Sequence, residues 1–148
     1  MSVFSPDLSI EVINKSWLPN LDKSFGLKVT AIEGDTLVAE MKVGEALLQP
    51  FGLMHGGVSC VLGESMGSVA AGMSLKNSSR TVVGQSLYAL HLRPVHKGMT
   101  LRIEASPQHI GRSSQIWNIL LMDKESMKPT ARITLTLAVI EKQATQKK

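Results

Sequence analysis

One carboxylate stands alone in the most apolar stretch of the chain. Between Gly56 and Leu75, Glu64 is the only charged side chain. Because burial of an unpaired carboxylate costs several kcal/mol, Glu64 must be paired, protonated or facing a wet cleft. In a cleft it would act as a general base or a nucleophile. The alternatives are a Glu at the exposed edge of a helix and a core ion pair.

Two residues share the helix face of Glu64. Cys60 and Ser68 lie one turn before and one turn after it, so Ser68 is placed to donate a hydrogen bond to whatever Glu64 binds. Cys60 has no convincing His partner one turn away. We therefore interpret it as a small, buried apolar residue rather than as a nucleophile.

His55-Gly56-Gly57 stands where a loop gives way to this apolar stretch. The first N–H groups of a helix have no intrahelical acceptor, and glycines let a ligand oxygen approach them closely. The segment therefore fits an oxyanion site, although simple turn and capping chemistry explains it equally well. Taken with Glu64, it predicts that donors at the helix start polarise a carbonyl group, which the carboxylate attacks directly or through water.

The elements that must position these residues follow from hydrophobic periodicity. Residues 7–18 predict an amphipathic helix with Leu8, Val12, Ile13 and Leu18 or Trp17 on one side. A period of two predicts a hairpin over 26–43, and a second helix covers 56–75. The period of two then returns in four stretches, at about 80–92, 98–109, 112–123 and 129–141.

This order of elements predicts an α+β fold. About six antiparallel strands curled round one helix would explain why that helix is apolar on all sides. The glycines of the helix lower its intrinsic stability by up to roughly 1 kcal/mol each. We therefore expect them to be required by the close approach of a sheet or a ligand.

Composition excludes several classes of protein. With 148 residues, 43% apolar and 19% charged, the chain has the makeup of one globular domain, 1–148. A net charge of +4 is below what nucleic-acid binding requires. One cysteine and four histidines form no metal-ligand pattern. No signal peptide or membrane-spanning run is recognisable, so we expect a cytoplasmic protein without metal, cofactor, nucleic-acid partner or membrane.

The segment Gln49-Pro50-Phe51-Gly52-Leu53-Met54-His55-Gly56-Gly57, continuing through Glu64 to Ala70, resembles the signature of hotdog-fold acyl-CoA thioesterases. The most similar branch is that of 4-hydroxybenzoyl-CoA and 1,4-dihydroxy-2-naphthoyl-CoA thioesterases in the PaaI-like superfamily, together with the proofreading thioesterases of siderophore synthesis. The resemblance covers about residues 25–141 and leaves 142–148 as a solvated tail. It implies the hotdog fold, an antiparallel sheet wrapped round one long helix.

The resemblance also implies roles for individual residues. Glu64 would be the catalytic carboxylate, either as a nucleophile or as a general base for water. The Gly56 N–H would hold the thioester oxygen, His55 and Gln49 would orient the carbonyl or the water, and Ser68 would position water or the acyl group. The implied substrate-binding residues are Gly57, Met54 and His91, with Arg93 and Arg112 placed for the phosphates of coenzyme A.

In such enzymes the site forms between two subunits of a homodimer, and two dimers form a homotetramer. The resemblance favours aromatic or medium-chain acyl groups. Hydrolysis of acyl-carrier-protein thioesters, a hotdog dehydratase, and a non-catalytic protein that binds acyl-CoA are the competing hypotheses.

Overall fold

The segments in which apolar and polar residues alternate are strands in the computed structural model, which describes residues 2–142. The strands are β1 (Lys28–Glu33), β2 (Thr36–Lys42), β3 (Arg80–His91), β4 (Thr100–Ile110), β5 (Ser114–Asp123) and β6 (Pro129–Glu141). They form one antiparallel sheet in the order β1-β2-β4-β5-β6-β3. The predicted hairpin and the α+β class are confirmed. The last strand of the chain, β6, lies between β5 and β3.

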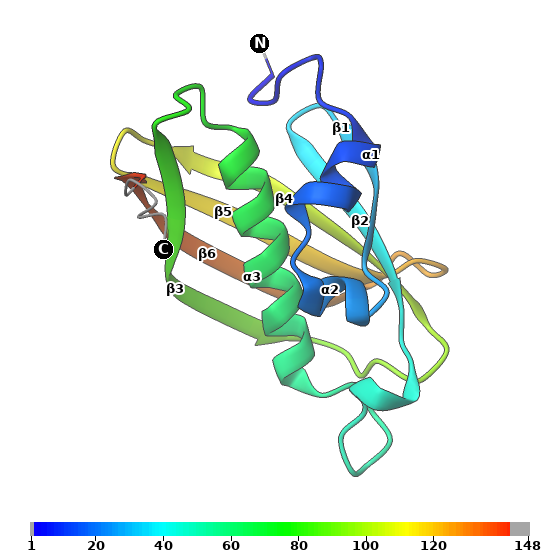
Figure 1. Cartoon of the computed structure of the whole chain (residues 1–148). Coiled ribbons are helices and arrows are strands. Elements are labelled where there is room, and N and C mark those ends of the chain that lie inside the picture. The colour runs from blue at the N-terminus through cyan, green and yellow to red at the C-terminus, as the bar shows by residue number, and fades with distance from the viewer. Residues whose placement is uncertain (1, 143–148) are drawn as a thin grey trace, which may run out of the picture.

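The long helix α3 (Gly56–Met73) lies across one face of this sheet (Figure 1). Two of its glycines explain how closely it packs. A Cβ at Gly63 would lie 2.7 Å from Ile133 of β6, and one at Gly67 would lie 2.6 Å from Leu135. The expectation that an approaching sheet requires glycines in this helix is therefore confirmed at these two positions.

The core fills the space between α3 and the sheet. Alternate residues of the central strands point into it, and Leu101, Ile103, Leu135 and Leu137 are fully buried. Trp117 of β5 is also fully buried and stacks on Phe4, with ring centroids 6.1 Å apart. The alternation that predicted these strands therefore corresponds to one face that is buried against α3.

The N-terminal segment differs from the single helix predicted over 7–18. One short helix, α1 (Ile10–Val12), runs into a π-helical turn, η1 (Ile13–Trp17), and a separate helix, α2 (Asn20–Ser24), follows Pro19. The side chain of Asn14 explains the irregular turn, because its Nδ2 donates to the Val29 carbonyl (2.9 Å) and its Oδ1 accepts from the Val29 N–H (2.8 Å).

The apolar face assigned to that predicted helix is also partly wrong. Ile13 and Leu18 are buried, but Val12 and Trp17 are exposed. Among residues 2–142, no helix is long and apolar enough to cross a membrane. Residues 143–148 of the predicted tail lie outside the described part of the chain.

Candidate functional site

The start of α3 is built by the loop before it. After a short 3-10 helix, η2 (Glu45–Leu47), the chain makes a tight turn in which the Gly52 N–H donates to the Gln49 carbonyl over 3.0 Å. His55 caps α3, because its Nδ1 accepts a hydrogen bond of 2.8 Å from the Gly57 N–H. The N–H of Gly56, at the first position of the helix, has no intrahelical acceptor and can bind a ligand oxygen.

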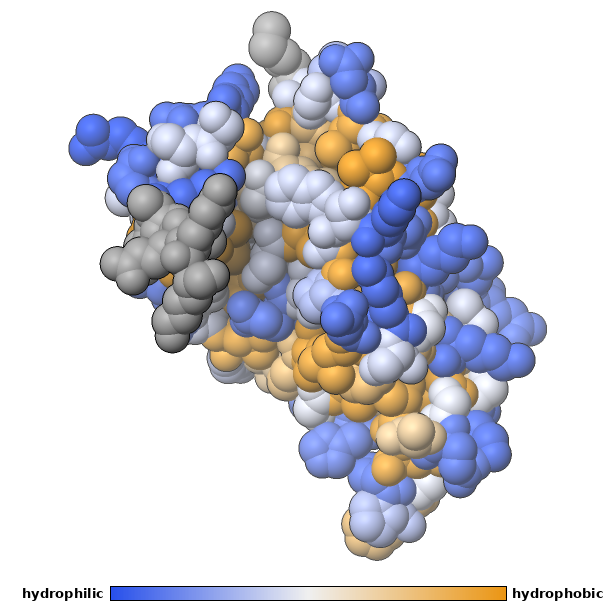
Figure 2. Space-filling model, in the orientation of Figure 1, coloured by the Kyte–Doolittle hydropathy of each residue, from blue (hydrophilic) through white to orange (hydrophobic). Residues whose placement is uncertain are grey.

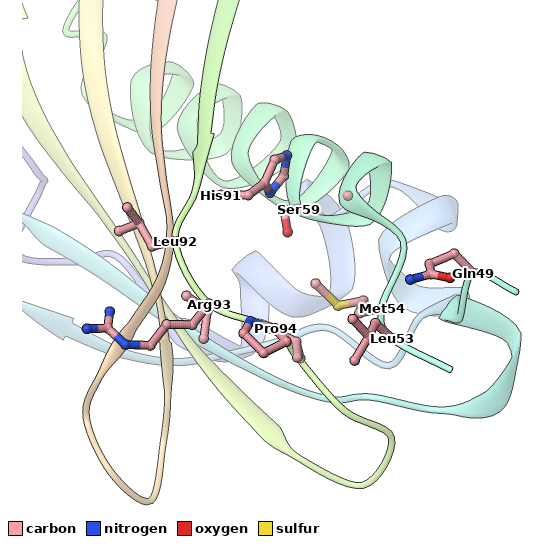
Figure 3. A pocket seen from close by; sticks show the side chains of 11 residues that line it. Gln49, Leu53, Met54, Ser59, His91, Leu92, Arg93 and Pro94 are labelled. Atoms are coloured by element: carbon pink, nitrogen blue, oxygen red, sulfur yellow. The ribbon is translucent and has the colours of Figure 1, made fainter. Parts of the chain in front are cut away.

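A cavity of about 420 Å³ opens beside this helix start (Figure 3). Five of the predicted site residues line it: Gln49, Met54, Gly56, His91 and Arg93. His91, at the end of β3, points toward the first turn of α3, and a Cβ on Gly56 would lie 3.2 Å from its Nε2. Ser59 was not predicted but also lines the cavity.

Glu64 lies farther along α3 and is half-buried. Its Oε1 accepts a hydrogen bond of 3.4 Å from Ser68 Oγ. Its carboxylate also lies against Gly84 of β3. A Cβ on Gly84 would overlap Oε1 and lie 3.1 Å from Cδ. The absence of a side chain at Gly84 therefore makes the space in which this carboxylate sits.

A second cavity, of about 390 Å³, contains Glu64 in its wall. It lies along α3 between α2 and the edge strand β3, and we call it the α3 groove. It is lined by Leu21, Cys60, Val61, Glu64, Ser65 and Leu87. Apolar surface gathers over this part of α3 and beside α2 (Figure 2). Cys60 is only half-buried and faces the groove, so the expectation of a buried core cysteine is wrong.

Within one chain, the start of α3 and the carboxylate of Glu64 lie too far apart to act on the same carbonyl group. Gly56 and Glu64 are eight residues apart on a continuous helix, which separates them by about 12 Å along the axis. They also face different cavities. The idea that one helix supplies both the oxyanion donors and the attacking carboxylate to a single carbonyl is therefore wrong for a lone subunit.

The two arginines expected at phosphates are also far apart in one chain. Arg93 lines the cavity at the end of β3, and its Nη1 donates to the Pro129 carbonyl over 2.6 Å. Arg112 lies near the start of β3, where its carbonyl accepts a hydrogen bond of 2.6 Å from Arg80. Since β3 runs from Arg80 to His91, roughly 35 Å separates these two ends.

Sequence reasoning did not assign three residues of the Glu64 environment: Gly84, Leu21 and Asp22. A glycine inside a strand often marks a close approach, and this signal was available for Gly84. Leu21 and Asp22 carried no comparable signal, because their roles depend on how α2 packs on α3.

Comparisons with known proteins agree with this architecture. The family profile described as "Thioesterase superfamily" matches residues 51–130. The Pseudomonas aeruginosa protein PA1618, which is called a thioesterase in its crystal structure, is 34% identical over 140 residues, covering 95% of each chain. The proofreading thioesterase EntH of Klebsiella pneumoniae is 40% identical over 119 residues, which are 80% of this chain and 85% of EntH.

Solved structures extend the similarity to three dimensions. The crystal structure of thioesterase HI1161 from Haemophilus influenzae superposes with a TM-score of 0.88 at 33% identity, covering 98% of this chain and 99% of that one. This establishes the hotdog fold, with its six-stranded antiparallel sheet packed on α3. The chain belongs to the thioesterase superfamily and is a thioesterase of the hotdog fold.

Proposed function

We propose that this protein hydrolyses acyl-CoA thioesters and that Glu64 is its catalytic carboxylate. The observation that carries the proposal is the position of Glu64 in the wall of the apolar α3 groove. Ser68 donates a hydrogen bond to its carboxylate, and Gly84 leaves the space that the carboxylate occupies. A carboxylate at the edge of an apolar groove suits a substrate with a reactive carbonyl at one end of an apolar group.

The chemistry follows from that arrangement. Glu64 either attacks the thioester carbon or removes a proton from the water that attacks it. As a general base, Glu64 passes the proton from the attacking water to the departing thiolate when the carbon–sulfur bond breaks, and the acid is released. As a nucleophile, Glu64 displaces the thiolate and forms a mixed anhydride. Water then hydrolyses this anhydride, which releases the acid, restores Glu64 and supplies the proton that the thiolate takes up. The Gly56 N–H would donate a hydrogen bond to the carbonyl oxygen as negative charge develops on it, while His55 and Gln49 orient the carbonyl or the water. Gly57 and Met54 would complete the binding surface.

A second copy of the chain would unite the two halves of the site. Because β3 is an edge strand, it has unpaired backbone groups along its outer side. If two β3 strands pair antiparallel about a two-fold axis near Leu87, the His91 end of one strand lies close to the partner's Gly84. Since Gly56 touches His91 and Glu64 touches Gly84, this pairing would bring the helix start of one chain to the carboxylate of the other.

The surface of β3 supports this dimer. Val83, Tyr88 and Leu90 are large apolar or aromatic residues that are 43%, 68% and 45% exposed. Such a row on an edge strand is a liability for a monomer and is normally covered. The same axis would put the Arg80 end of β3, and with it Arg112, near the His91 end of the partner's β3, where the partner's first cavity lies. Arg93 and Arg112 would then both lie near the phosphates of coenzyme A, and two such dimers would form the homotetramer.

The acyl group is proposed to be aromatic or of medium chain length. The α3 groove, at about 390 Å³, is near the lower end of the range for ligand pockets, roughly 300–1,000 Å³. The resemblance of residues 49–70 to the aromatic acyl-CoA thioesterases and proofreading thioesterases favours such a substrate, and the proofreading thioesterase EntH is similar to this chain.

The test is continuous thiol release from benzoyl-, 4-hydroxybenzoyl-, phenylacetyl-, hexanoyl- and palmitoyl-CoA, with wild type and Glu64→Ala side by side. We expect turnover of the aromatic and medium-chain members and a loss of roughly 10²–10⁴-fold in the variant. An unchanged rate in folded Glu64→Ala would refute the role of Glu64. No turnover of any substrate by the folded oligomer would point instead to a carrier-protein substrate or to binding without catalysis.

A further inference from the structure

One residue that lines the α3 groove comes from outside the sheet-and-helix core. Leu21 of α2 lines it beside Val61 and Glu64 of α3. Leu87 lines it from strand β3. Leu21 is 52% exposed, although it is apolar and belongs to a helix of only five residues. The apolar part of a substrate bound in this groove would contact the half-exposed side chain of Leu21.

The position of Leu21 is fixed from both sides. At the end of α2, the Leu27 N–H donates to the Asp22 carbonyl over 3.0 Å and the Gly26 N–H donates to the Lys23 carbonyl over 3.1 Å. With Gly26 at φ 78°, this is a Schellman motif that stops the helix. Lys23 Nζ also donates to the Lys15 carbonyl of η1 over 2.9 Å.

Asp22, the residue after Leu21, packs α2 against α3. Asp22 is fully buried beside Ser65, so the face of α2 that follows Leu21 is turned into the protein. One turn farther back, Trp17 rests on α3, since a Cβ on Gly72 would lie 2.8 Å from its ring. The N-terminal segment is therefore packed along α3, and Leu21 forms a rigid part of the groove wall.

We propose that Leu21 is a specificity-determining residue that limits the length of the acyl group. The inference rests on the proposed function, because the acyl carbonyl, or the water that attacks it, must lie within about 3.5 Å of the Glu64 carboxylate for reaction. An acyl chain that starts there and follows Val61 along the apolar wall of α3 meets Leu21. Short chains and single rings end before it, and longer chains collide with it.

Chain-length profiles test this inference. We would measure kcat/KM for butanoyl-, hexanoyl-, octanoyl-, decanoyl- and dodecanoyl-CoA with wild type, Leu21→Ala, Leu21→Trp and Val12→Ala. Val12 is a matched control, since it is an exposed apolar residue of the same N-terminal segment that does not line the groove.

Each additional methylene that finds apolar surface raises kcat/KM by roughly fourfold. We therefore expect Leu21→Ala to move the optimum at least one substrate longer and to raise kcat/KM for dodecanoyl-CoA by roughly tenfold. Leu21→Trp should move the optimum to a shorter chain, and Val12→Ala should keep the wild-type profile.

An unchanged optimum in folded Leu21→Ala, or the same shift in Val12→Ala, would overturn the inference. Thermal melts establish folding, and if Leu21→Ala does not fold, the decision rests on Leu21→Trp and Leu21→Met. The proposed function fails separately, through inactive wild type or an active Glu64→Ala variant. An active, Glu64-dependent enzyme with an unaltered chain-length profile rejects only the role of Leu21.

Discussion

At the scale of single residues, the carboxylate of Glu64, which we propose is catalytic, needs the space that the missing side chain of Gly84 leaves. Glu64 occupies the space left by Gly84, so a methyl group there would push the carboxylate aside. A misplacement of about 1 Å costs on the order of 10² in rate, and we expect Gly84→Ala to lose roughly that factor in kcat/KM. Steady-state thiol release measures it.

Gly44→Ala is the matched control, because a Cβ at Gly44 meets nothing within 4 Å. It should keep wild-type activity and thermal stability. Wild-type kcat/KM in Gly84→Ala would show that the carboxylate does not need this space.

A second prediction for a single residue concerns how the buried Asp22 makes the stability of the protein depend on pH. It is fully buried, and neither carboxylate oxygen has a hydrogen-bond partner among the described residues. Burial raises the pKa of Asp22 above its ordinary value of 3.8, and the nearby Ser65 only partly opposes the rise. Above pH 3.8 the unfolded chain ionises first while the folded chain holds the proton. The free energy of unfolding therefore falls as pH rises through the folded pKa, and the stabilising contribution is fully present only below the unfolded value.

Asp22→Asn should remove this dependence. We expect the variant to exceed wild type in free energy of unfolding by roughly 1–3 kcal/mol at pH 7, since the amide carries no charge to desolvate. The advantage should vanish as the pH approaches 3.8. Urea unfolding at several pH values measures both quantities. A constant difference between the two proteins at all pH values would contradict this account.

At the scale of elements, α3 shows how packing overrides helix propensity. Ala is roughly 1 kcal/mol better than Gly within a helix. We nevertheless expect Gly63→Ala to lower the free energy of unfolding by about 1–3 kcal/mol, because its Cβ would overlap Ile133. In denaturant titrations, Ile133→Val should recover part of the loss when combined with Gly63→Ala. Strict additivity of the two substitutions would argue against the contact.

The same scale shows what could be predicted from the sequence. Strands β3 to β6 follow from the period of two that burial of one strand face produces. Helix α3 follows from a run of small and apolar residues, which burial on most sides requires. The break in the N-terminal helix could not be predicted, because it depends on Asn14 reaching Val29 across the fold. Similarly, Glu64 and His55-Gly56 could be recognised by type, whereas their assignment to separate cavities required the helix to be placed on the sheet.

At the scale of the whole molecule, the proposed site between two subunits can be tested by complementation. Glu64→Ala and His55→Ala chains, each nearly inactive alone, should form mixed dimers in which one of the two sites has both residues intact. Random association gives about half mixed dimers, and hence about one quarter of wild-type activity in the unfractionated mixture and about one half in the mixed dimers isolated through both tags. Co-expression with two affinity tags, followed by purification and thiol-release assays, measures the recovery. A mixed dimer no more active than its parents would mean that the residues do not act across the interface.

The position of β6 in the sheet also determines when the protein can fold during its synthesis. β3 has β6 as its sheet neighbour, with Gly84 opposite Leu137 and His91 opposite Ala131. At about 5–20 residues per second, a ribosome needs roughly 2–7 s to make the residues between these two strands. Throughout that interval the strand that carries half of the site has nowhere to pair. Folding therefore waits for the final strand, and a chain released before β6 is complete exposes β3 to proteases and to aggregation.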